Sequence, residues 1–570
     1  MESFSRLGFA PRDGQVAAVN EILTAYIDEG KRNVILNAST GTGKSIIGAV
    51  VAETYSVLKG NKVGPKSSIS LTATNVLAEQ YETSFIKIAD AGQYAMIKGA
   101  GNYDCNALST PEQTETADAC AWFTMVQESA TFQATLDQHC SRCEYLGVKK
   151  KRNQVRHLTT NYSFYFIDRL YSGMFEDRDL IVWDEAHLVN DLFSEHNAIH
   201  FSQKSLMKAA MDIADKVGLS DPKIAKLIKA IGNDCAIPDK INETNYRTYL
   251  LGLKEIYSYA KDLGGQEGER ALRRGDMKKY STLKRFVREY EGKFCKIDDL
   301  FNFEYDHVFE YNKDDKAVTI KPIFVGNMMD ALYCGDESKN LFMSATVSEG
   351  FMTKTLQLDP AKTKFIKLEP TFPKESKEVV FLDPISLNYA SMQDPKTIKK
   401  LRSNIRKIVE HHVEKSERGI VLAPSFKVAR EAADELASVK GVKIFEHKQG
   451  EKLIHILDAF KLYKGGPAVL ISPSMYEGID LPGDLSRFQI LVKAPFPSLG
   501  DRRMKYILDR HPDIYNTITI MKMVQGAGRS VRSIDDHATT YVLDVNGKRV
   551  FTSKTNIWQD EFKLRFASEP

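Results

Sequence analysis

The chain has 570 residues, and its 78 lysines and arginines against 75 acidic residues leave a formal charge of +3. Hydrophobic residues make up 43% and charged residues 27%, ordinary globular values that exclude a mainly disordered or fibrous chain. Because the net charge is small, any nucleic-acid site must be a local basic surface. No apolar run approaches ~20 residues and the N-terminus lacks the apolar stretch of a signal peptide, so we expect a soluble, cytoplasmic protein without a membrane-spanning helix.

Short apolar runs alternate with helical periods over the first hundred residues. Strands are predicted at 33–38, 68–74 and 94–99, and helices at 14–29, 44–58 and 75–88. Buried strands that alternate with helices predict an α/β fold in which a parallel sheet is covered on both faces.

Two stretches of different character interrupt this pattern. Residues 100–150 are polar, irregular and cysteine-bearing, whereas residues 200–315 have helical periods and are rich in lysine and aromatic residues. Strand-like segments return at 179–185, 317–325 and 340–346. From about residue 375 a second series begins, with strands predicted at 379–382, 419–424, 442–446, 468–472, 488–494 and 539–544. We therefore expect two α/β units, the first interrupted twice.

The segment ASTGTGKS at 38–45 has the spacing of a phosphate-binding loop between a strand and a helix. Gly41 and Gly43 let backbone N–H groups approach a phosphate, and the helix that follows points its positive end at the anion. Lys44 can reach the β and γ phosphates of a nucleotide, and the Ser45 hydroxyl can bind Mg²⁺. A glycine-rich structural turn is the weaker alternative.

The run LIVWDEAHL at 180–188 supplies the acidic partner that such a loop needs. Asp184 ends the predicted strand, at the edge where parallel sheets bind ligands, and is expected to hold Mg²⁺ through water. Glu185 is expected to orient and activate the attacking water, and His187 could sense the γ-phosphate. The tetrapeptide alone is a weak signal, because it also occurs in exposed turns, but it is strong beside the loop.

Arginines recur far from the loop, in QGAGRSVRS at 525–533. Gln525, Arg529 and Arg532 have the spacing of one helix face, and such arginines can stabilise charge on a transferring phosphoryl group. A solvated basic helix face is the alternative. In SPSMYEGIDLPGD at 472–484, Gly478 and Asp480 follow a predicted strand, which alone is an ordinary turn-rich loop.

In chain order these segments resemble the motifs of the superfamily 2 helicases, and within them the XPD/DinG group of iron–sulfur helicases. The matching segments are FAPRDGQ at 9–15 for the adenine-reading element, 38–45 for motif I, LTATNVLAEQ at 71–80 for motif Ia, IKGAGNYDC at 97–105 for the lead-in to the first cluster cysteine, DEAH at 184–187 for motif II, MSAT at 343–346 for motif III, GIVLAPSF at 419–426 for motif IV, MYEGIDLPGD at 475–484 for motif V and QGAGRSVR at 525–532 for motif VI. The ordered combination is specific, although no single segment is.

The resemblance implies two RecA-like parallel-sheet motor domains with ATP and Mg²⁺ bound between them, the first interrupted by an iron–sulfur insertion and a helical Arch insertion. The implied domains are the first motor domain at 1–99, 151–200 and 317–350, the iron–sulfur domain at 100–150, the Arch domain at 201–316 and the second motor domain at 351–570. The implied ATP contacts are Gln15, Thr40, Gly41, Thr42, Gly43, Lys44, Asp184, Gly478 and Asp480, the Mg²⁺ ligands are Ser45 and Asp184, and the catalytic residues are Lys44, Glu185, His187, Gln525, Arg529 and Arg532.

Four of the seven cysteines lie in the irregular insertion, at Cys105, Cys120, Cys140 and Cys143. Thiolates are soft ligands that select zinc or iron–sulfur clusters, and their spacing does not choose between the two. Unrelated reduced thiols are the remaining alternative. The family resemblance implies a [4Fe–4S] cluster. The other three, Cys235, Cys295 and Cys334, are interpreted as core or incidental.

Two runs of basic residues could bind a nucleic-acid strand. The first comprises Lys149, Lys150, Lys151, Arg152 and Arg156; the second comprises Arg270, Arg273, Arg274, Lys278, Lys279, Lys284, Arg285 and Arg288, interleaved with Tyr280, Phe286 and Tyr290. Cations that track phosphates, with aromatic rings that stack on bases, are typical of sequence-independent single-strand binding. We favour this function for the first run, whereas solvated helix faces are an equal alternative for the second. Thr74 and Ser425 match positions that touch the strand backbone in the family.

The predicted function is that of an ATP-dependent DNA helicase. By resemblance it moves 5′ to 3′ on single-stranded DNA and unwinds duplex, forked, R-loop or D-loop structures as a monomer in DNA repair or replication. The alternative is a nucleic-acid-stimulated ATPase that remodels protein–nucleic acid or RNA–DNA structures without processive unwinding. A redox enzyme is disfavoured because no flavin or nicotinamide fingerprint accompanies the cysteines. We expect no nuclease domain before the motor and no C-terminal partner-binding extension.

Overall fold

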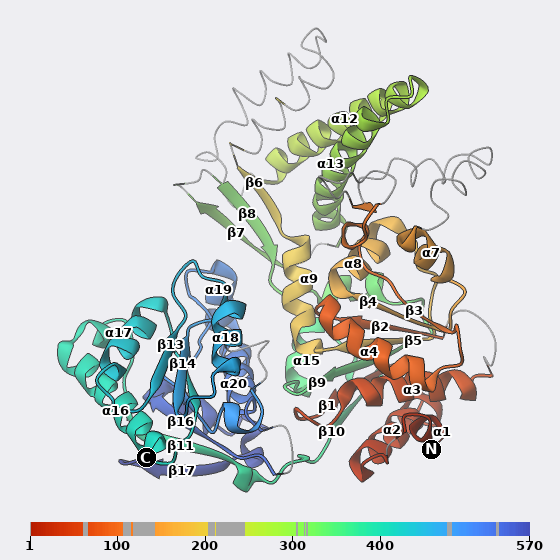
Figure 1. The fold of residues 1–570 in the computed structure, drawn as a ribbon. Helices are drawn as coiled ribbons and strands as arrows, with labels where there is room; N and C mark the ends of the chain where they lie inside the picture. Colours follow the sequence, from red (N-terminus) through yellow and green to blue (C-terminus); the bar gives the residue numbers. More distant parts are fainter. Residues whose placement is uncertain are drawn as a thin grey trace.

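A computed structural model shows two sheet-based lobes side by side, with a helical hairpin above the first (Figure 1). The residues that it describes are 2–8, 10–60, 67–105, 116–117, 143–202, 204, 211, 246–303, 306–312, 314, 317–475, 481–531 and 535–570.

The first lobe is built on a seven-stranded sheet whose neighbouring strands are all parallel. In spatial order its strands are β10 (Thr363–Lys367), β1 (Asn33–Asn37), β9 (Lys339–Ser344), β5 (Leu180–Asp184), β2 (Ser68–Thr72), β4 (His157–Asn161) and β3 (Tyr94–Met96). Strands β1, β2 and β5 are buried along their whole length, as expected for parallel strands covered on both faces.

Helices cover both faces of this sheet. The helices α2 (Asp13–Ile27), α3 (Lys44–Leu58) and α4 (Asn75–Ile88) share one apolar core with it, and α8 (Tyr162–Ile167), α9 (Val189–Asn197) and α15 (Glu349–Leu356) share the other. The short α1 (Glu2–Ser5) and α14 (Met329–Leu332) complete the lobe. The α/β prediction for this lobe is confirmed.

The second lobe repeats the plan with another seven-stranded parallel sheet. In spatial order its strands are β13 (Lys443–Glu446), β14 (Ala468–Ser472), β12 (Gly419–Leu422), β15 (Phe488–Leu491), β16 (Ala538–Asp544), β11 (Lys377–Ile385) and β17 (Lys563–Ala567). Its helices are α16 (Pro395–Glu414) and α17 (Phe426–Leu436) on one face, and α18 (Leu453–Leu462), α19 (Arg502–Arg510), α20 (Pro512–Ala527) and α21 (Val545–Phe551) on the other. All six strands predicted for this lobe are present.

A long antiparallel helix pair on a small sheet is inserted in the sequence of the first lobe, between β5 and β9. The helices are α12 (Tyr246–Arg273) and α13 (Met277–Phe303), and the sheet pairs β6 (Ile199–Ser202), β8 (Ala317–Pro322) and β7 (His307–Asn312) in antiparallel fashion. The helix α7 (Glu144–Lys151) leads from the cysteine-bearing stretch back to β4. None of the helices that the structure describes is both long and apolar enough to cross a membrane.

Two strands lie in different sheets from those the sequence suggests. The segment at 317–325 was expected to return to the first motor domain, but β8 pairs with β6 and β7. Its burial alternates residue by residue, which fits an antiparallel strand with one solvated face and not a covered parallel strand. The second domain was placed from residue 351, yet β10 pairs with β1 in the first sheet, so the crossover to the second lobe comes after Lys367.

Candidate active site

The phosphate loop joins β1 to α3, and glycines shape its turn. Gly41 and Gly43 have φ angles of 82° and 79°, in the left-handed region that other residues rarely adopt. A Cβ on Gly43 would lie 2.6 Å from Gln15 Nε2, so a larger residue would displace the Gln15 amide. The loop therefore delivers Lys44 as the first residue of α3, with the helix N-terminus directed at the site.

Gln15 on α2 supports this loop from one side. Its amide donates to the Thr42 carbonyl at 2.8 Å and accepts from the Arg12 backbone N–H at 3.0 Å. The Arg12 guanidinium donates to the Gly41 carbonyl at 2.6 Å. These bonds fix the loop, while the role of Gln15 in reading adenine stays a prediction.

The remaining loop residues lie at the boundary between the lobes. Lys44 Nζ donates to the Ala38 carbonyl at 3.4 Å, and Ser45 is half-buried in the first turn of α3. Thr40 Oγ1 donates to the carbonyl of Gly528, a residue of the second lobe, at 3.4 Å. A nucleotide on this loop would therefore face both lobes.

Motif II lies at the carboxyl end of β5. Asp184 is its last residue and is buried, and Glu185 follows with a φ of 51°, a left-handed conformation that is uncommon for a residue other than glycine. Burial and the adjacent Glu185 raise the pKa of Asp184 to about 7. Burial opposes ionisation of Glu185 as well, but Lys44 and His187 lower the pKa of Glu185 to about 2.

These carboxylates fit a magnesium site. A buried carboxyl group beside a half-buried one favours a divalent cation, which neutralises both. Oxygen ligands from Ser45 and Asp184 are of the kind that Mg²⁺ prefers beside substrate phosphates. The donor set is therefore consistent with the predicted metal.

A chain of hydrogen bonds leads from Glu185 to the second lobe. Ser344 Oγ donates to Glu185 Oε2 at 3.0 Å, and lies 2.8 Å from His187 Nδ1. Because the Ser344 hydrogen is used on Glu185, His187 Nδ1 donates to Ser344. His187 Nε2 is then an acceptor, and Gln525 Nε2 donates to it at 2.9 Å. The same amide donates to Thr346 Oγ1 at 2.9 Å, so motifs II, III and VI share one network.

Arg529 does not share a helix face with Gln525. Helix α20 ends at Ala527 with Gly528 as its C-cap, so Arg529 lies beyond the helix. The helical spacing was misleading because glycine, a poor helix former, ends the helix there. Arg529 is buried, whereas Arg532, Gly478 and Asp480 lie outside the described residues.

One contact at the loop had no sequence signal. Ser39 Oγ donates to Glu561 Oε2 at 2.7 Å, and Lys377 Nζ lies 3.6 Å from the same oxygen. All three side chains are buried. Ser39 and Glu561 are 522 positions apart, and nothing near Glu561 resembles a motif, so only the fold shows the pair.

Thr74 and Ser425 occupy equivalent positions in the two lobes. Thr74 follows β2 and caps α4, its hydroxyl accepting from the Leu77 N–H at 3.3 Å. Ser425 follows β12 and caps α17, its hydroxyl accepting from the Val428 N–H at 3.3 Å. Both residues are exposed at the start of a helix. Their placement is suited to a strand backbone that crosses both lobes.

The basic run of α7 is partly enclosed. Lys150 and Lys151 are exposed, whereas Lys149 and Arg152 are half-buried. Burial, Arg152 and Arg288 lower the pKa of Lys149 to about 8. Because Arg288 belongs to α13, cations of α7 and of the helical hairpin lie close together.

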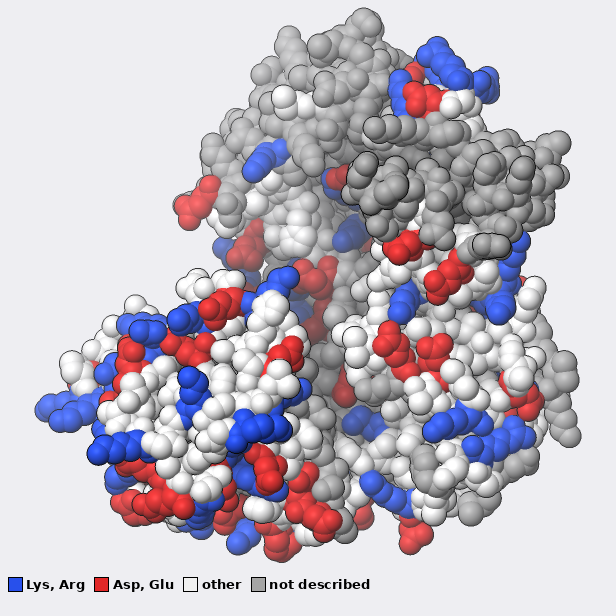
Figure 2. Space-filling view, in the orientation of Figure 1, with Lys and Arg blue, Asp and Glu red and all other residues white. Residues whose placement is uncertain are grey.

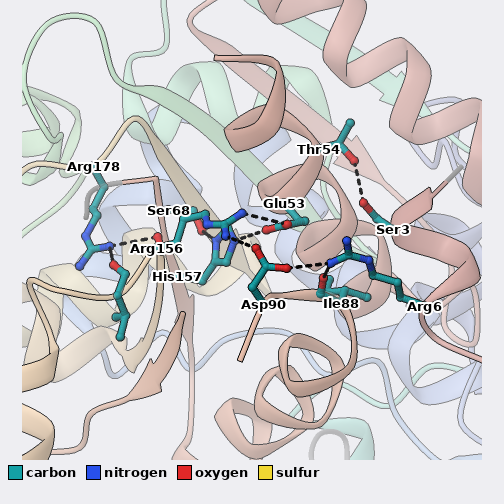
Figure 3. A network of polar contacts seen from close by, with 11 residues as sticks. Ser3, Arg6, Glu53, Thr54, Ser68, Ile88, Asp90, Arg156, His157 and Arg178 are labelled. Carbon is teal, nitrogen blue, oxygen red and sulfur yellow. Dashed lines mark hydrogen bonds and ion pairs between the residues drawn. The ribbon is translucent and has the colours of Figure 1, made fainter. Parts of the chain in front are cut away.

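Arg156, grouped with this run in the sequence, has a different role. Its side chain is fully buried and donates to Glu53 Oε1 at 3.0 Å and Asp90 Oδ2 at 2.7 Å (Figure 3). Glu53 Oε2 lies 2.6 Å from His157 Nε2. Arg156 therefore links β4 to α3 internally, and assigning it to a strand-binding surface was wrong.

The aromatic residues of the helical hairpin are core. Tyr280, Phe286 and Tyr290 are buried, with the Phe286 and Tyr290 rings 4.6 Å apart. They hold α12 against α13 and are not open stacking platforms. Lys and Arg side chains gather at the tip of the hairpin beside acidic ones (Figure 2). Among them Arg270 pairs with Glu267, as expected of a solvated helix face, and the side chains of Lys278 and Arg285 are outside the described part.

Two of the four proposed cluster ligands can be placed. Cys105 is buried and Cys143 half-buried, whereas Cys120 and Cys140 lie outside the described residues. The ring of Tyr103, two residues before Cys105, packs 5.2 Å from the ring of Tyr145, two residues after Cys143. The two ends of the insertion thus lie side by side, as a shared cluster requires. Within the described ranges no three potential ligands gather into a metal site.

Comparisons with known proteins agree with the two-lobed architecture. Residues 8–212 match the family model of the type III restriction enzyme res subunit, and residues 408–558 match that of the helicase C-terminal domain. The ATP-dependent DNA helicase YoaA of Escherichia coli is 21% identical over 94% of this chain and 92% of that protein. The ATP-dependent DNA helicase DinG of Photobacterium profundum is 25% identical over 41% of this chain and 35% of that protein.

Solved structures share the fold. An XPD helicase superposes with a TM-score of 0.62 and 16% identity, over 97% of this chain and 99% of that chain. The Xpd4 structure from S. tokodaii has a TM-score of 0.56 and 16% identity, over 97% and 100% of the two chains.

The phosphate loop, the acidic motif and the network that joins the lobes define an ATP-hydrolysing helicase of superfamily 2. Within that class it is similar to the XPD/DinG-like helicases, in sequence to YoaA and DinG and in fold to XPD.

Proposed function

We propose that the chain is an ATP-dependent DNA helicase that moves 5′ to 3′ along single-stranded DNA and opens forks, R-loops or D-loops without reading their sequence. It would act as a monomer in the cytoplasm, in DNA repair or replication. The observation that carries the proposal is the contact of Gln525 with His187 and Thr346, which ties the hydrolysis site of one lobe to the other. The relatives named DNA helicases support DNA as the nucleic acid.

The hydrolysis step follows from the residues around the loop. Lys44 and the N-terminus of α3 would bind the β and γ phosphates, and Ser45 and Asp184 would hold Mg²⁺, which neutralises phosphate charge. Glu185, ionised through its lowered pKa, would orient the attacking water and accept its proton. Arg529, with Arg532, Gly478 and Asp480, would approach the nucleotide from the second lobe.

Coupling to movement follows from the same network. Gln525 can donate to both His187 and Thr346 only while the lobes are close, since its two partners belong to the first lobe. Bound ATP would favour the close arrangement and hydrolysis would release it. Thr74 and Ser425, one on each lobe, would then hold the strand in turn.

The strand would also contact the exposed face of α7. Lys150 and Lys151 are exposed there, and Lys149 and Arg152 lie beside Arg288 of the hairpin. Cations at this junction suit a phosphate backbone that passes between α7 and the hairpin.

The cysteines fit a [4Fe–4S] cluster. Cys105, Cys120, Cys140 and Cys143 would hold it, and the packing of Tyr103 on Tyr145 supports this by bringing the first and last ligand segments together. When bound, such a cluster cross-links four distant thiolates and so stabilises an irregular insertion. Anaerobic purification with visible absorption tests the assignment, because a colourless protein with one zinc and full activity would overturn it.

Strand displacement on duplexes with a 5′ or a 3′ single-stranded tail tests the function. We expect displacement of the 5′-tailed duplex only, with ATP and Mg²⁺, and none by Lys44→Ala. ATP hydrolysis without displacement of either duplex would favour a remodelling ATPase instead.

A further inference from the structure

A carboxylate of the second lobe lies against the phosphate loop of the first lobe. Glu561 ends the short helix η12 (Gln559–Glu561), which precedes β17, and its Oε2 accepts from the Ser39 hydroxyl at 2.7 Å. Ser39 lies in the loop between β1 and α3. Both side chains are buried, and a hydrogen bond away from water is electrostatically stronger than an exposed one. The hydrolysis step proposed above does not use Glu561.

Glu561 is fixed within its own lobe. Lys377, the first residue of β11, places its Nζ 3.6 Å from the same Oε2 and 5.1 Å from the centre of the Phe562 ring. The other carboxylate oxygen of Glu561, Oε1, is buried and has no hydrogen-bond partner among the described residues. Because a buried carboxylate needs polar partners, Glu561 depends on Lys377 and Ser39. The second lobe therefore presents a fixed acceptor to the phosphate loop.

Ser39 connects this acceptor to the turn of the loop. Its carbonyl accepts from the Thr42 hydroxyl at 2.8 Å and from the Thr42 N–H at 3.3 Å, across the turn that contains Gly41. The Thr42 carbonyl accepts from Gln15 of α2 at 2.8 Å. The loop is thus held by Gln15 from the first lobe and by Glu561 from the second. Because backbone N–H groups of such a loop bind phosphate, its shape affects nucleotide affinity.

The next residue of the loop also contacts the second lobe. Thr40 Oγ1 donates to the Gly528 carbonyl at 3.4 Å, so two successive loop residues have partners there. Both contacts cross between the lobes and are made only while the lobes are close. The Glu561 contact is the shorter of the two and the one that involves a charged group, so it contributes more to this coupling.

We propose that Glu561 is a positioning residue for ATP binding, which holds the phosphate loop through Ser39 and makes ATP bind more tightly when the lobes are close. The proposal rests on the proposed function and adds to it a residue that lies outside the motifs. By thermodynamic linkage, bound ATP favours closing of the lobes by the same factor. Glu561 thereby acts on ATP affinity, whereas Gln525 acts on the hydrolysis step.

The first experiment measures binding of adenylyl imidodiphosphate, a non-hydrolysable ATP analogue, to the full chain with Mg²⁺. Ser39→Ala removes the bond and keeps the charge pair of Glu561 and Lys377, so we expect the Kd to rise about tenfold, the effect of one charge-assisted hydrogen bond. Ser194→Ala is the matched control and should leave the Kd unchanged. The Ser194 hydroxyl is also buried and donates to the Pro322 carbonyl at 2.6 Å, but it belongs to α9 and not to the loop.

Two double variants test the acceptor without burying an unpaired charge. Both carry Lys377→Met; one adds Glu561→Gln, which keeps an oxygen for Ser39, and the other adds Glu561→Leu, which does not. We expect the first to bind the analogue within about threefold of the wild type and the second about tenfold more weakly. Adding Ser39→Ala to the second should raise the Kd no further, because the bond is already lost. Equal Kd values for the two double variants would contradict the proposal.

Steady-state hydrolysis distinguishes positioning from a purely structural role. Ser39→Ala and the double variant with Glu561→Leu should raise the KM for ATP about tenfold and keep kcat within about twofold of the wild type. A purely structural role would lower the urea midpoint and leave KM unchanged. If the wild type binds the analogue and these variants bind it equally well, the positioning role is wrong and the helicase proposal stands. If the wild type does not bind the analogue, both proposals fall.

Discussion

Gln525 Nε2 lies 2.9 Å from His187 Nε2 and 2.9 Å from Thr346 Oγ1, so one amide of the second lobe contacts two motifs of the first. The tautomer of His187 follows from its contact with Ser344, because the Nδ1 hydrogen is directed to Ser344, which in turn donates to Glu185, and Nε2 is left to accept from Gln525. Three hydrogen bonds therefore connect α20 to Glu185, the residue proposed to activate water.

Gln525→Ala should slow ATP hydrolysis. It removes two hydrogen bonds worth about 1 kcal/mol each, which together correspond to about a 30-fold loss in kcat. Steady-state hydrolysis with saturating ATP measures the effect. Gln393→Ala, an exposed glutamine of the same lobe, is the control. A Gln525→Ala rate within about twofold of the wild type would contradict the role of the network.

Lys377→Met should destabilise the protein. It leaves the buried carboxylate of Glu561 with Ser39 but without its cation, and uncompensated buried charges cost about 3–5 kcal/mol. The double variant Lys377→Met with Glu561→Gln should recover most of this loss, because no charge is then buried. Chemical denaturation of the wild type, Lys377→Met and the double variant measures their free energies of unfolding. Equal losses of this free energy in the single and the double variant would contradict the prediction.

Arg156 and Lys151 should respond oppositely to replacement by methionine. Arg156→Met leaves Glu53 without its buried partner and should cost about 3–5 kcal/mol of stability, with no change in the salt slope of strand binding. Lys151→Met changes an exposed side chain and should cost under about 0.5 kcal/mol while lowering that slope. Denaturation and binding titrations on both variants check this, and a lowered slope for Arg156→Met would restore the sequence-based assignment.

Stability should fall between about pH 6.5 and pH 4, in part through His196. Burial and the nearby Lys296 lower the pKa of His196 to about 4 in the folded chain, against about 6.5 when unfolded. The unfolded state then binds more protons in this window, so stability is present above it and is lost as the pH falls. The His196 contribution at about pH 4.5 is a loss of about 2–3 kcal/mol.

His196→Phe should remove that part of the pH dependence, since a phenyl ring fits among the neighbouring Phe166 and Phe193 rings. Urea midpoints at about pH 7 and pH 4.5 compare the two proteins. An equal fall of the urea midpoint in the wild type and in His196→Phe would show that groups other than His196 cause the pH dependence.

The sequence predicted the structural features that are fixed by residues close together along the chain. The strand–loop–helix around Gly41, Gly43 and Lys44 and the strand that ends at Asp184 are fixed by residues within a few positions of one another, and both are present. The membership of β8 and β10 in their sheets depends on partners far along the chain, which no local pattern specifies.

The candidate site likewise combines residues that local sequence identified with contacts that depend on distant partners. His187 and Gln525 were recognisable as motif residues, but the partners of Ser39, and the burial of Arg156 among acidic residues, exist only through tertiary contacts. Tyr280 and Tyr290 were expected to be open stacking rings or part of a solvated helix face, yet both are buried. The packing of the hairpin, which no local pattern specifies, places them in the core.

The most direct test of the account is the ATP hydrolysis rate of the wild type and of Lys44→Ala, each with and without single-stranded DNA. The account predicts that the strand stimulates ATP hydrolysis by the wild type and that Lys44→Ala hydrolyses ATP under neither condition, because Lys44 is the cation proposed to bind the β and γ phosphates. Strand-stimulated hydrolysis by Lys44→Ala would contradict it.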